Sequence, residues 1–557
     1  MKLYKGIAGA PGIVCADVIY FEKQTGEKQN ISIDEARERA IAKVQKLYEK
    51  ALAELGEDKA KIFSAYQMLL EDEMLIAPIK AAIEQGTEPE EAVHTTTETM
   101  ASKLASKSNE YLRRRADDIR YIGEMLTDIL NGKDTEFSFP EGNKKYILAA
   151  HELTPVDTMM FDSSRLAGMI CELGGATSHT VILAKSLGIP AVVGVSGLKE
   201  ADRAENAYLD GYTGTFVVSP DRETEEEYIK KVRDEAELIK KLDEIRQSEA
   251  RTADGERIAV CINIGKPLDM KDTENEKIDG VGLFRSEFLY SSSAKKPTFE
   301  EQTEAYRTVI KKAYPNSVTI RTLDIGGDKQ LEYLNMKKEE NPFLGNRGIR
   351  LCLSNKDIFE EQLRAILIAA AGEKVKIMLP MVTCISEIKR TKELLREICE
   401  KLDEEKTEYC KDAAVGIMIE TPASAIMAAD FAKHSDFFSI GTNDLVQYIM
   451  AADRGNADVE KLYNPYHPAV MRMLKNVINA EASAGIEVSV CGDLAANTAF
   501  TKVLLGMGLK KFSVPLPMVS RIKYKISTVN LKDAEILAEK VLNAESEAEI
   551  EKLIKGE

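Results

Sequence analysis

Polar and charged side chains follow several short apolar runs in the second half of the chain, at the point where each run ends. Because these runs alternate with amphipathic segments, we expect parallel strands whose carboxyl ends meet at one edge. Arginine forks bind phosphate and carboxylate oxygens in bidentate geometry, and carboxylates are ligands that Mg²⁺ prefers. The pattern predicts a site for a small substrate that carries both phosphate and carboxylate. The residues are Arg285, Arg321, Glu420, Asn443, Asp444 and Arg454.

An alternative is that these charges form ion pairs that close the rim of a barrel. One or two such ion pairs would be ordinary. For the whole set, however, suitable charged side chains would have to occur at several separate strand ends by chance. We therefore interpret the set as a substrate site, with Glu420 and Asp444 as the candidate Mg²⁺ ligands.

A cysteine, Cys491, ends another apolar run, in the segment Cys491-Gly492-Asp493. A lone cysteine at a strand end is more often a small buried side chain than a catalytic group. In an anion-rich pocket a thiol can also donate a proton. From its position alone, the buried side chain is the favoured interpretation.

One histidine, His179, begins a predicted helix behind the glycine-rich segment Gly174-Gly175-Ala176-Thr177-Ser178. Thr177 or Ser178 can cap that helix. The free amides of a helix start attract anions, and a neutral imidazole is a nucleophile toward phosphorus. A capped helix containing a histidine is by itself more often structural, so both interpretations stay open. The other histidines lack this setting and are interpreted as non-catalytic: His94, His151, His434 and His467.

The elements that must position these residues indicate a multidomain α/β chain. After Gly255, β-rich runs alternate with helical patterns, which predicts a C-terminal (β/α)8 barrel. The predicted strands are Ile258–Ile262, Val281–Phe284, Val318–Ile320, Lys376–Leu379, Val415–Ile419, Phe437–Ile440, Val488–Val490 and Phe512–Val514.

The N-terminal half combines strand signals with a long stretch of helical periodicity, from about Ser32 to Leu130. The simplest account is an α/β domain into which an α-helical bundle is inserted. A charge-rich helical segment then connects it to the barrel. The predicted boundaries are 1–21 and 143–221 for the α/β domain, 22–142 for the bundle, 222–250 for the linker and 251–557 for the barrel.

Composition limits the classes of protein that remain. The chain has 557 residues, with 75 Lys and Arg against 92 Asp and Glu, for a net charge of −17. Such an acidic chain is a poor binder of nucleic acid or anionic membranes. We find no signal segment and no apolar run of membrane-spanning length. The eight cysteines form no C-x-x-C pair. We expect a cytoplasmic protein with free thiols.

The glycine-rich segment Gly174-Gly175-x-Thr177-Ser178-His179 resembles the phosphohistidine signature of the phosphoenolpyruvate-utilising enzymes. Other segments resemble that family's barrel motifs, and together they extend over essentially the whole chain. The arrangement is most similar to the enzyme I family of the bacterial phosphoenolpyruvate:sugar phosphotransferase system. The barrel segments are Asp324-Ile325-Gly326-Gly327-Asp328-Lys329, Glu420-Thr421-Pro422 and Gly441-Thr442-Asn443-Asp444-Leu445.

The resemblance implies a phosphoenolpyruvate–protein phosphotransferase whose α/β domain carries the phosphohistidine. His179 would be phosphorylated, and Cys491 would protonate the enolate to give pyruvate, which reverses the interpretation of this cysteine from position alone. The bundle would dock a histidine-containing phosphocarrier protein, and the barrel would form a homodimer. Arg285, Arg321, Asn443, Asp444 and Arg454 would bind phosphoenolpyruvate, and Glu420 and Asp444 would hold Mg²⁺.

Three positions depart from the family pattern. Ala176 stands where many members have Arg, Lys185 where Arg is usual, and Tyr66 where His is common. Lys185 would replace a guanidinium fork by a point charge. Tyr66 lies in the bundle that would dock the carrier, so it would change a contact with that partner.

Acidic residues outnumber lysines between Glu54 and Glu91, which fits a basic carrier. Solubility alone accounts for that excess equally well.

Two other functions are alternatives. A pyruvate phosphate dikinase or phosphoenolpyruvate synthase shares the motifs but needs a nucleotide-binding domain, for which this chain has no room. The sequence also has no G-x-x-x-x-G-K-[ST] segment. A catalytically idle regulatory homologue would be expected to have lost His179 or an arginine, and none is lost.

Overall fold

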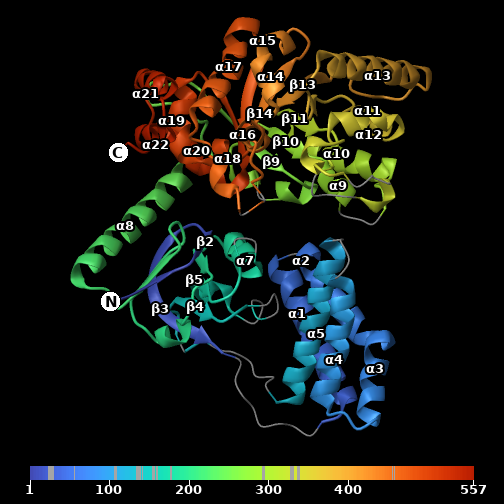
Figure 1. Cartoon of the computed structure of the whole chain (residues 1–557), viewed down its shortest axis with the longest axis vertical. Helices are drawn as coiled ribbons and strands as arrows, with labels where there is room; N and C mark the ends of the chain where they lie inside the picture. Colours follow the sequence, from blue (N-terminus) through green and yellow to red (C-terminus); the bar gives the residue numbers. More distant parts are fainter. Residues whose placement is uncertain are drawn as a thin grey trace. The chain divides into compact units, whose positions relative to one another are not determined.

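The computed structural model describes the chain in two compact units, Met1–Leu238 and Ile239–Glu557, and Figure 1 labels many of their elements. It describes all residues except 23–30, 56, 106–109, 133–138, 141, 154–156, 158–160, 176–177, 272, 292–294, 327–330, 335–338, 455, 457 and 557.

A mixed sheet organises the first unit, with strand order β1-β8-β7-β3-β4-β5-β6-β2. The pairs from β3 through β6 in this order are parallel, and the outer strands pair antiparallel. The central strands are short apolar runs that are buried along most of their length, as expected for a sheet covered on both faces. The strands are β1 (Lys2–Lys5), β2 (Ile7–Ala10), β3 (Ile13–Phe21), β4 (Tyr146–Ala150), β5 (Leu166–Cys171), β6 (Ala191–Val193), β7 (Ala207–Asp210) and β8 (Thr215–Val218).

A group of helices lies between β3 and β4 in the sequence, although these two strands are paired neighbours in the sheet. These helices bury an apolar core of their own. Tyr66 belongs to that core: it is buried, and its ring stacks on that of Tyr121 at 5.1 Å between centroids. The helices are α1 (Ile33–Leu55), α2 (Glu57–Glu71), α3 (Glu73–Glu84), α4 (Pro89–Ala105) and α5 (Glu110–Leu130).

The second unit is built on a closed barrel of parallel strands, in the order β10-β11-β12-β13-β14-β15-β16-β9. The prediction of a multidomain α/β protein with a C-terminal (β/α)8 barrel is confirmed. Each predicted run overlaps one strand, but Arg285 and Arg321 end strands β10 and β11 rather than following them. The strands are β9 (Ala259–Ile264), β10 (Val281–Arg285), β11 (Val318–Arg321), β12 (Val375–Leu379), β13 (Ala414–Ile419), β14 (Phe437–Gly441), β15 (Glu487–Cys491) and β16 (Lys511–Pro515).

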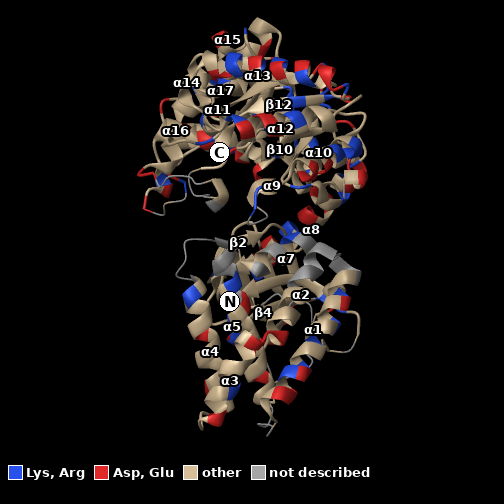
Figure 2. Ribbon diagram, turned by 90° about the vertical axis from the view of Figure 1, so that its right-hand side faces the viewer, with Lys and Arg blue, Asp and Glu red and all other residues tan. Residues whose placement is uncertain are grey.

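Helices between and after the strands surround the barrel, and their apolar faces contribute to one continuous core with the outer faces of the strands. In α13, charged residues stand between the buried apolar ones, and Figure 2 marks Lys and Arg in blue and Asp and Glu in red. The longer helices are α8 (Arg222–Ile245), which crosses the boundary between the units, then α10 (Phe299–Ala313), α12 (Lys356–Ala369), α13 (Ile385–Glu404), α16 (Thr442–Met450), α17 (Pro468–Ala484), α19 (Thr498–Gly506), α20 (Val519–Ser527), α21 (Leu531–Asn543) and α22 (Glu547–Lys555). Short helices are α9 (Glu287–Ser291), α11 (Ile349–Ser354), α14 (Pro422–Ile426), α15 (Ala428–Phe431) and α18 (Asp493–Ala496).

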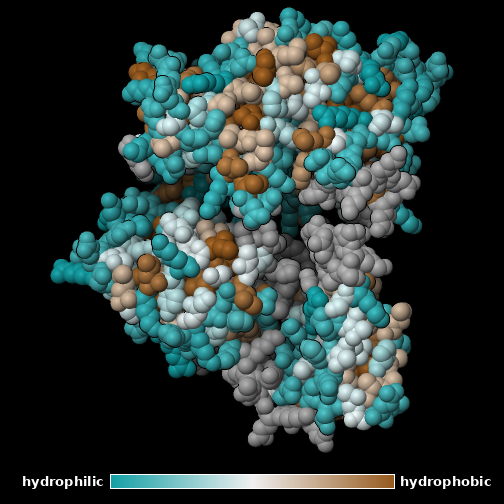
Figure 3. All heavy atoms as spheres, in the orientation of Figure 1, coloured by the Kyte–Doolittle hydropathy of each residue, from teal (hydrophilic) through white to brown (hydrophobic). Residues whose placement is uncertain are grey.

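The surface is of mixed polarity, and the face in Figure 3 shows apolar residues interspersed among hydrophilic ones. Among the described residues, no helix is both long enough and apolar enough to cross a bilayer. All eight cysteines are free thiols.

Candidate active site

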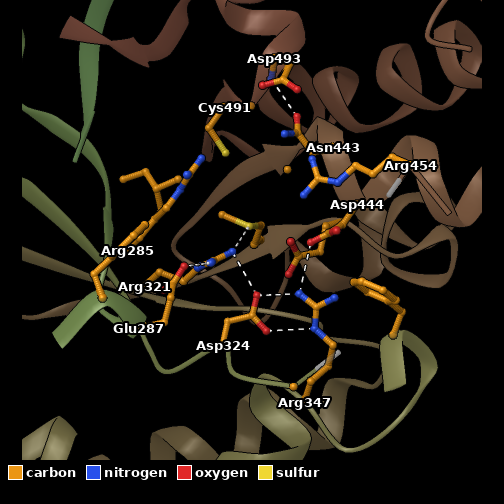
Figure 4. A pocket seen from close by; sticks show the side chains of 18 residues that line it. Arg285, Glu287, Arg321, Asp324, Arg347, Asn443, Asp444, Arg454, Cys491 and Asp493 are labelled. Carbon is orange, nitrogen blue, oxygen red and sulfur yellow. Dashed lines mark hydrogen bonds and ion pairs between the residues drawn. The ribbon is translucent and has the colours of Figure 1, made fainter. Parts of the chain in front are cut away.

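A cavity of about 450 Å³ lies at the carboxyl ends of the barrel strands, where the polar side chains of several strands converge (Figure 4). All of the barrel residues predicted to form the site line this cavity. They are Arg285, Arg321, Glu420, Asn443, Asp444, Arg454 and Cys491. The closed barrel explains this convergence, because parallel strands bring their carboxyl ends to the same rim.

Arg321, the last residue of β11, is buried between two carboxylates. Its Nη2 lies 2.5 Å from Glu287 Oε1, and its Nη1 lies 3.2 Å from Asp324 Oδ2. Burial alone would lower the pKa of Arg321, but Glu287 and Asp324 raise it, so the guanidinium stays charged. Its Nε and the Oε2 of Glu287 are buried and have no hydrogen-bond partner in the described structure. Such groups are ready to bind a polar ligand.

Arg347 forms the second half of the same charge network. Its Nε and Nη2 donate to the two carboxylate oxygens of Asp324 at 3.1 and 2.9 Å, and Nη2 lies 3.4 Å from Asp444 Oδ2. Burial would lower the pKa of Arg347, whereas Asp324 and Asp444 raise it. Asp324 therefore bridges Arg321 and Arg347 and fixes the spacing of two cations at the barrel mouth (Figure 4).

Glu420, which follows β13, is 1% exposed, and its Oε1 accepts a hydrogen bond from the backbone N–H of Met381 at 2.6 Å. Burial, together with the neighbouring carboxylates of Asp444 and Asp324, raises the pKa of Glu420 to about 8. A divalent cation held by Glu420 and Asp444 would offset this repulsion. Within the described residues, no cluster of three or more His, Cys, Asp or Glu forms a metal site. Two carboxylates leave positions for water and substrate oxygens, which suits Mg²⁺.

The turn after β15 forms part of the cavity wall. Asn443 Oδ1 accepts a hydrogen bond from the backbone N–H of Asp493 at 2.8 Å, and Thr442 Oγ1 donates to the carbonyl oxygen of Cys491 at 3.0 Å. Gly492 lies between these contacts with φ 89° and ψ −169°, a region open essentially to glycine alone. A Cβ at this position would lie 2.5 Å from Thr442 Oγ1 and 2.6 Å from Asn443 Oδ1.

The thiol of Cys491 is buried at the end of β15 and lines the cavity. Its Sγ accepts a hydrogen bond from Ser439 Oγ and donates one to the carbonyl oxygen of Ile440, both at 3.4 Å. Burial raises the pKa of Cys491, although the Ser439 hydroxyl opposes this shift. The thiol therefore remains protonated at neutral pH, in the state that can act as an acid.

His179 lies in the first unit, where it begins helix α7 (His179–Leu187), and its imidazole is outside the described part of the chain. Gly174 has φ 111°, and a Cβ there would lie 3.1 Å from the Cβ of Ser178, which accounts for a glycine in this loop. Of the two predicted caps, Ser178 occupies the N-cap position, but its hydroxyl is buried and makes no hydrogen bond in the described structure. Ala176 and Thr177 lie outside the described residues.

The charge network includes three residues that were not predicted from the sequence as its members: Glu287, Asp324 and Arg347. Glu287 and Asp324 follow Arg285 and Arg321 within three residues, so their spacing along the strand ends was a usable signal. Arg347 lies between β11 and β12 in Gly345-Asn346-Arg347-Gly348, far from either strand end in sequence. Only the folded loop brings it to the cavity.

The fold and the cavity define a (β/α)8-barrel enzyme that takes a small anionic substrate. Three models of the phosphoenolpyruvate-utilising enzymes match the chain. The N-terminal model matches residues 5–115, the mobile-domain model residues 142–214, and the phosphoenolpyruvate-binding-domain model residues 239–531.

Full-length relatives bear more specific names. The phosphoenolpyruvate-protein phosphotransferase of Bacillus subtilis (strain 168) is 39% identical over 572 residues, covering 100% of this chain and 99% of its own. That of Priestia megaterium is 37% identical over 568 residues, with the same coverage. A solution NMR structure of Enzyme I (nEIt) is 31% identical, with a TM-score of 0.35, and covers 42% of this chain and 98% of its own. Because of the family models and the full-length relatives, the chain belongs to the phosphoenolpyruvate-utilising enzymes, in the group of the phosphoenolpyruvate-protein phosphotransferases.

Replacing Gly492 by alanine tests the wall formed by Asn443. Gly492→Ala should lower kcat/KM for phosphoenolpyruvate at least about tenfold, because the new Cβ displaces Thr442 and Asn443. The matched control is Gly485→Ala: Gly485 also has a positive φ, 68°, but an added Cβ there meets no atom within 4 Å. Both variants should lose about 1–3 kcal/mol of stability. Equal kcat/KM for the two variants would contradict this account.

Proposed function

We propose that the protein transfers the phosphoryl group of phosphoenolpyruvate to His179 and from there to a small histidine-containing phosphocarrier protein. The observation that supports this most directly is the meeting of several arginines with the carboxylates of Glu420 and Asp444 and a protonated thiol in one cavity. Arginines suit the phosphate and carboxylate of this substrate. Phosphoryl transfer depends mainly on positioning and charge neutralisation, which such a cavity provides.

In the proposed reaction, Arg285, Arg321, Asn443, Asp444 and Arg454 bind phosphoenolpyruvate. His179 attacks phosphorus in line, so that an N–P bond forms as the bond between phosphorus and the enol oxygen breaks. Cys491 then gives its proton to the methylene carbon of the enolate, which yields pyruvate. The thiolate regains a proton from solvent. Since His179 and the cavity belong to different units, the reaction requires His179 to reach the cavity and later the carrier.

We propose Mg²⁺ as the metal, with Glu420 and Asp444 as its protein ligands. The raised pKa of Glu420 supports this, because burial and the neighbouring carboxylates of Asp444 and Asp324 make its charged form costly. When bound, the ion neutralises negative charge on the substrate. The arginines of the cavity would neutralise the same negative charge.

We also propose that residues 1–21 and 143–221 form the phosphohistidine domain, that the bundle 22–142 docks the carrier, and that 222–250 serve as the linker. Three exposed acidic residues on the bundle fit a basic partner: Glu71, Asp72 and Glu73.

We propose that the barrel, residues 251–557, forms a homodimer. The exposed apolar side chains of Leu344, Ile426 and Leu462 could contribute to such an interface. The free thiols support a cytoplasmic location.

Labelling from phosphoenolpyruvate tests the role of His179. The protein should take up ³²P from labelled phosphoenolpyruvate with Mg²⁺ and no nucleotide, and His179→Ala should take up none. His94→Ala is the control, because His94 is an exposed histidine of α4 in the same unit. A wild-type protein without label would favour an idle homologue. A need for ATP would favour a dikinase.

Replacing Cys491 tests the proton donor. Cys491→Ala should slow pyruvate formation by about 10²–10⁴-fold, the usual contribution of a positioned acid. Cys261→Ala is the matched control, since Cys261 is an equally buried thiol of β9 that does not line the cavity. Pyruvate release at the wild-type rate by Cys491→Ala would contradict the assignment, as would an equal loss in both variants.

The pH dependence of the metal requirement tests Glu420. The pKa of Glu420 is raised to about 8, so below that pH its carboxyl carries a proton that the metal must displace. The Mg²⁺ concentration for half-maximal activity should therefore rise up to about tenfold from pH 8 to pH 7. Glu420→Gln should need far more Mg²⁺ and lose this pH dependence, whereas Glu276→Gln, outside the cavity, should retain it. A metal requirement that is constant across this range would contradict the assignment.

A further inference from the structure

A buried glutamine on an outer helix connects the ends of two neighbouring barrel strands. Gln362 of α12 is fully buried, and its Oε1 accepts a hydrogen bond from the backbone N–H of Leu323 at 2.9 Å. Its Nε2 donates to Ser286 Oγ at 3.0 Å, and Ser286 Oγ donates in turn to the carbonyl oxygen of Arg321 at 2.6 Å. One side-chain amide thus joins the segment after β10 to the segment after β11.

The two segments that Gln362 joins carry much of the charge network. Ser286 stands between Arg285 and Glu287, and Leu323 stands between Arg321 and Asp324. All four flanking residues line the cavity, as Figure 4 shows. Gln362 itself does not line the cavity and is separated from it by the backbone that it binds. The amide oxygen and nitrogen of Gln362 therefore fix the relative position of cavity side chains that Gln362 itself does not contact.

The strength of this connection follows from its burial. Ser286 and Gln362 are both 0% exposed, so no water can replace a lost bond at low cost. Nε2 of Gln362 also donates to the hydroxyl of Tyr306 at 3.1 Å, which fixes the orientation of the amide. A buried network whose members all have partners holds its backbone segments in one arrangement.

We infer that Gln362 is a positioning residue for the substrate site: by joining Ser286 to Leu323, it sets the spacing between the Arg285–Glu287 and Arg321–Asp324 segments. This inference rests on the proposed function, because phosphoenolpyruvate is the substrate whose binding reports that spacing. A displacement of about 1 Å in such groups can cost up to about 10²-fold in rate. The effect should appear in substrate binding and turnover, and not only in stability.

The barrel offers a matched control in Gln302 of α10. Gln302 is also 0% exposed and sits in the same sector: its Oε1 accepts from Tyr290 Oη at 2.9 Å, and its Nε2 donates to Glu361 Oε1 at 3.0 Å. It also donates to the carbonyl oxygen of Pro297 at 3.3 Å. None of these partners is a strand-end residue of the cavity. Gln302→Met thus removes a buried amide of equal size without touching the connection.

The experiment compares Gln362→Met, Gln302→Met and Ser286→Ala in the full-length protein. Melting curves measure stability, steady-state kinetics give kcat and KM for phosphoenolpyruvate, and titration calorimetry on the His179→Ala background gives its Kd without turnover. We expect both methionine variants to melt at lower temperature. Gln362→Met should lose about tenfold or more in kcat/KM and bind phosphoenolpyruvate correspondingly more weakly, while Gln302→Met stays within about twofold of wild type.

Ser286→Ala breaks the same connection from the other side and tests the inference if Gln362→Met does not fold. It should weaken phosphoenolpyruvate binding, and combining it with Gln362→Met should add little further loss. The inference is overturned if the folded Gln362→Met or Ser286→Ala protein keeps wild-type kcat/KM and Kd, or if Gln302→Met loses as much. Failure of the proposed function is distinct, because the wild-type protein itself would then neither bind phosphoenolpyruvate nor phosphorylate His179.

Discussion

The buried pairing of arginines with carboxylates at the barrel mouth is the interaction on which the rest of the site depends. Asp324 contacts both Arg321 and Arg347, and Arg347 reaches Asp444, so one carboxylate sets the distance between two cations. Removing one partner from such a buried pair commonly costs about 3–5 kcal/mol, because the other charge is left uncompensated. The network therefore keeps its charges fixed before any substrate arrives, which is what electrostatic catalysis requires.

The closed barrel makes this network possible. Most of its members stand at or just after strand ends that are far apart in sequence, and a barrel of parallel strands brings those ends to one rim. Arg347 joins them from the loop between β11 and β12. Backbone positions that accept little but glycine then allow close approach, as at Gly492 beside Thr442 and Asn443. Helix α12 supports the rim from outside through Gln362. The proposed chemistry adds a nucleophile from another unit to this prearranged cavity.

Much of the barrel and its cavity could be predicted from the sequence, because strand periodicity and strand-end polarity are local signals. Arg285 and Arg321 were found in this way, although as residues after a strand rather than its last members. Arg347 could not be found, since its loop reaches the cavity only through tertiary folding. Gln362 was missed for a related reason: a glutamine within a helical pattern gives no sign that its amide binds two strand ends. The role of Cys491 depended on a family resemblance, because position alone favoured a buried side chain.

The most direct test of the central claim is ³¹P NMR of the intact protein mixed with phosphoenolpyruvate and Mg²⁺ in the absence of nucleotide, with pyruvate measured in the same sample. The account predicts an acid-labile phosphoramidate signal that appears in equal amount to the pyruvate formed. Pyruvate without that signal, or a phosphoenolpyruvate signal that persists unchanged, would contradict it.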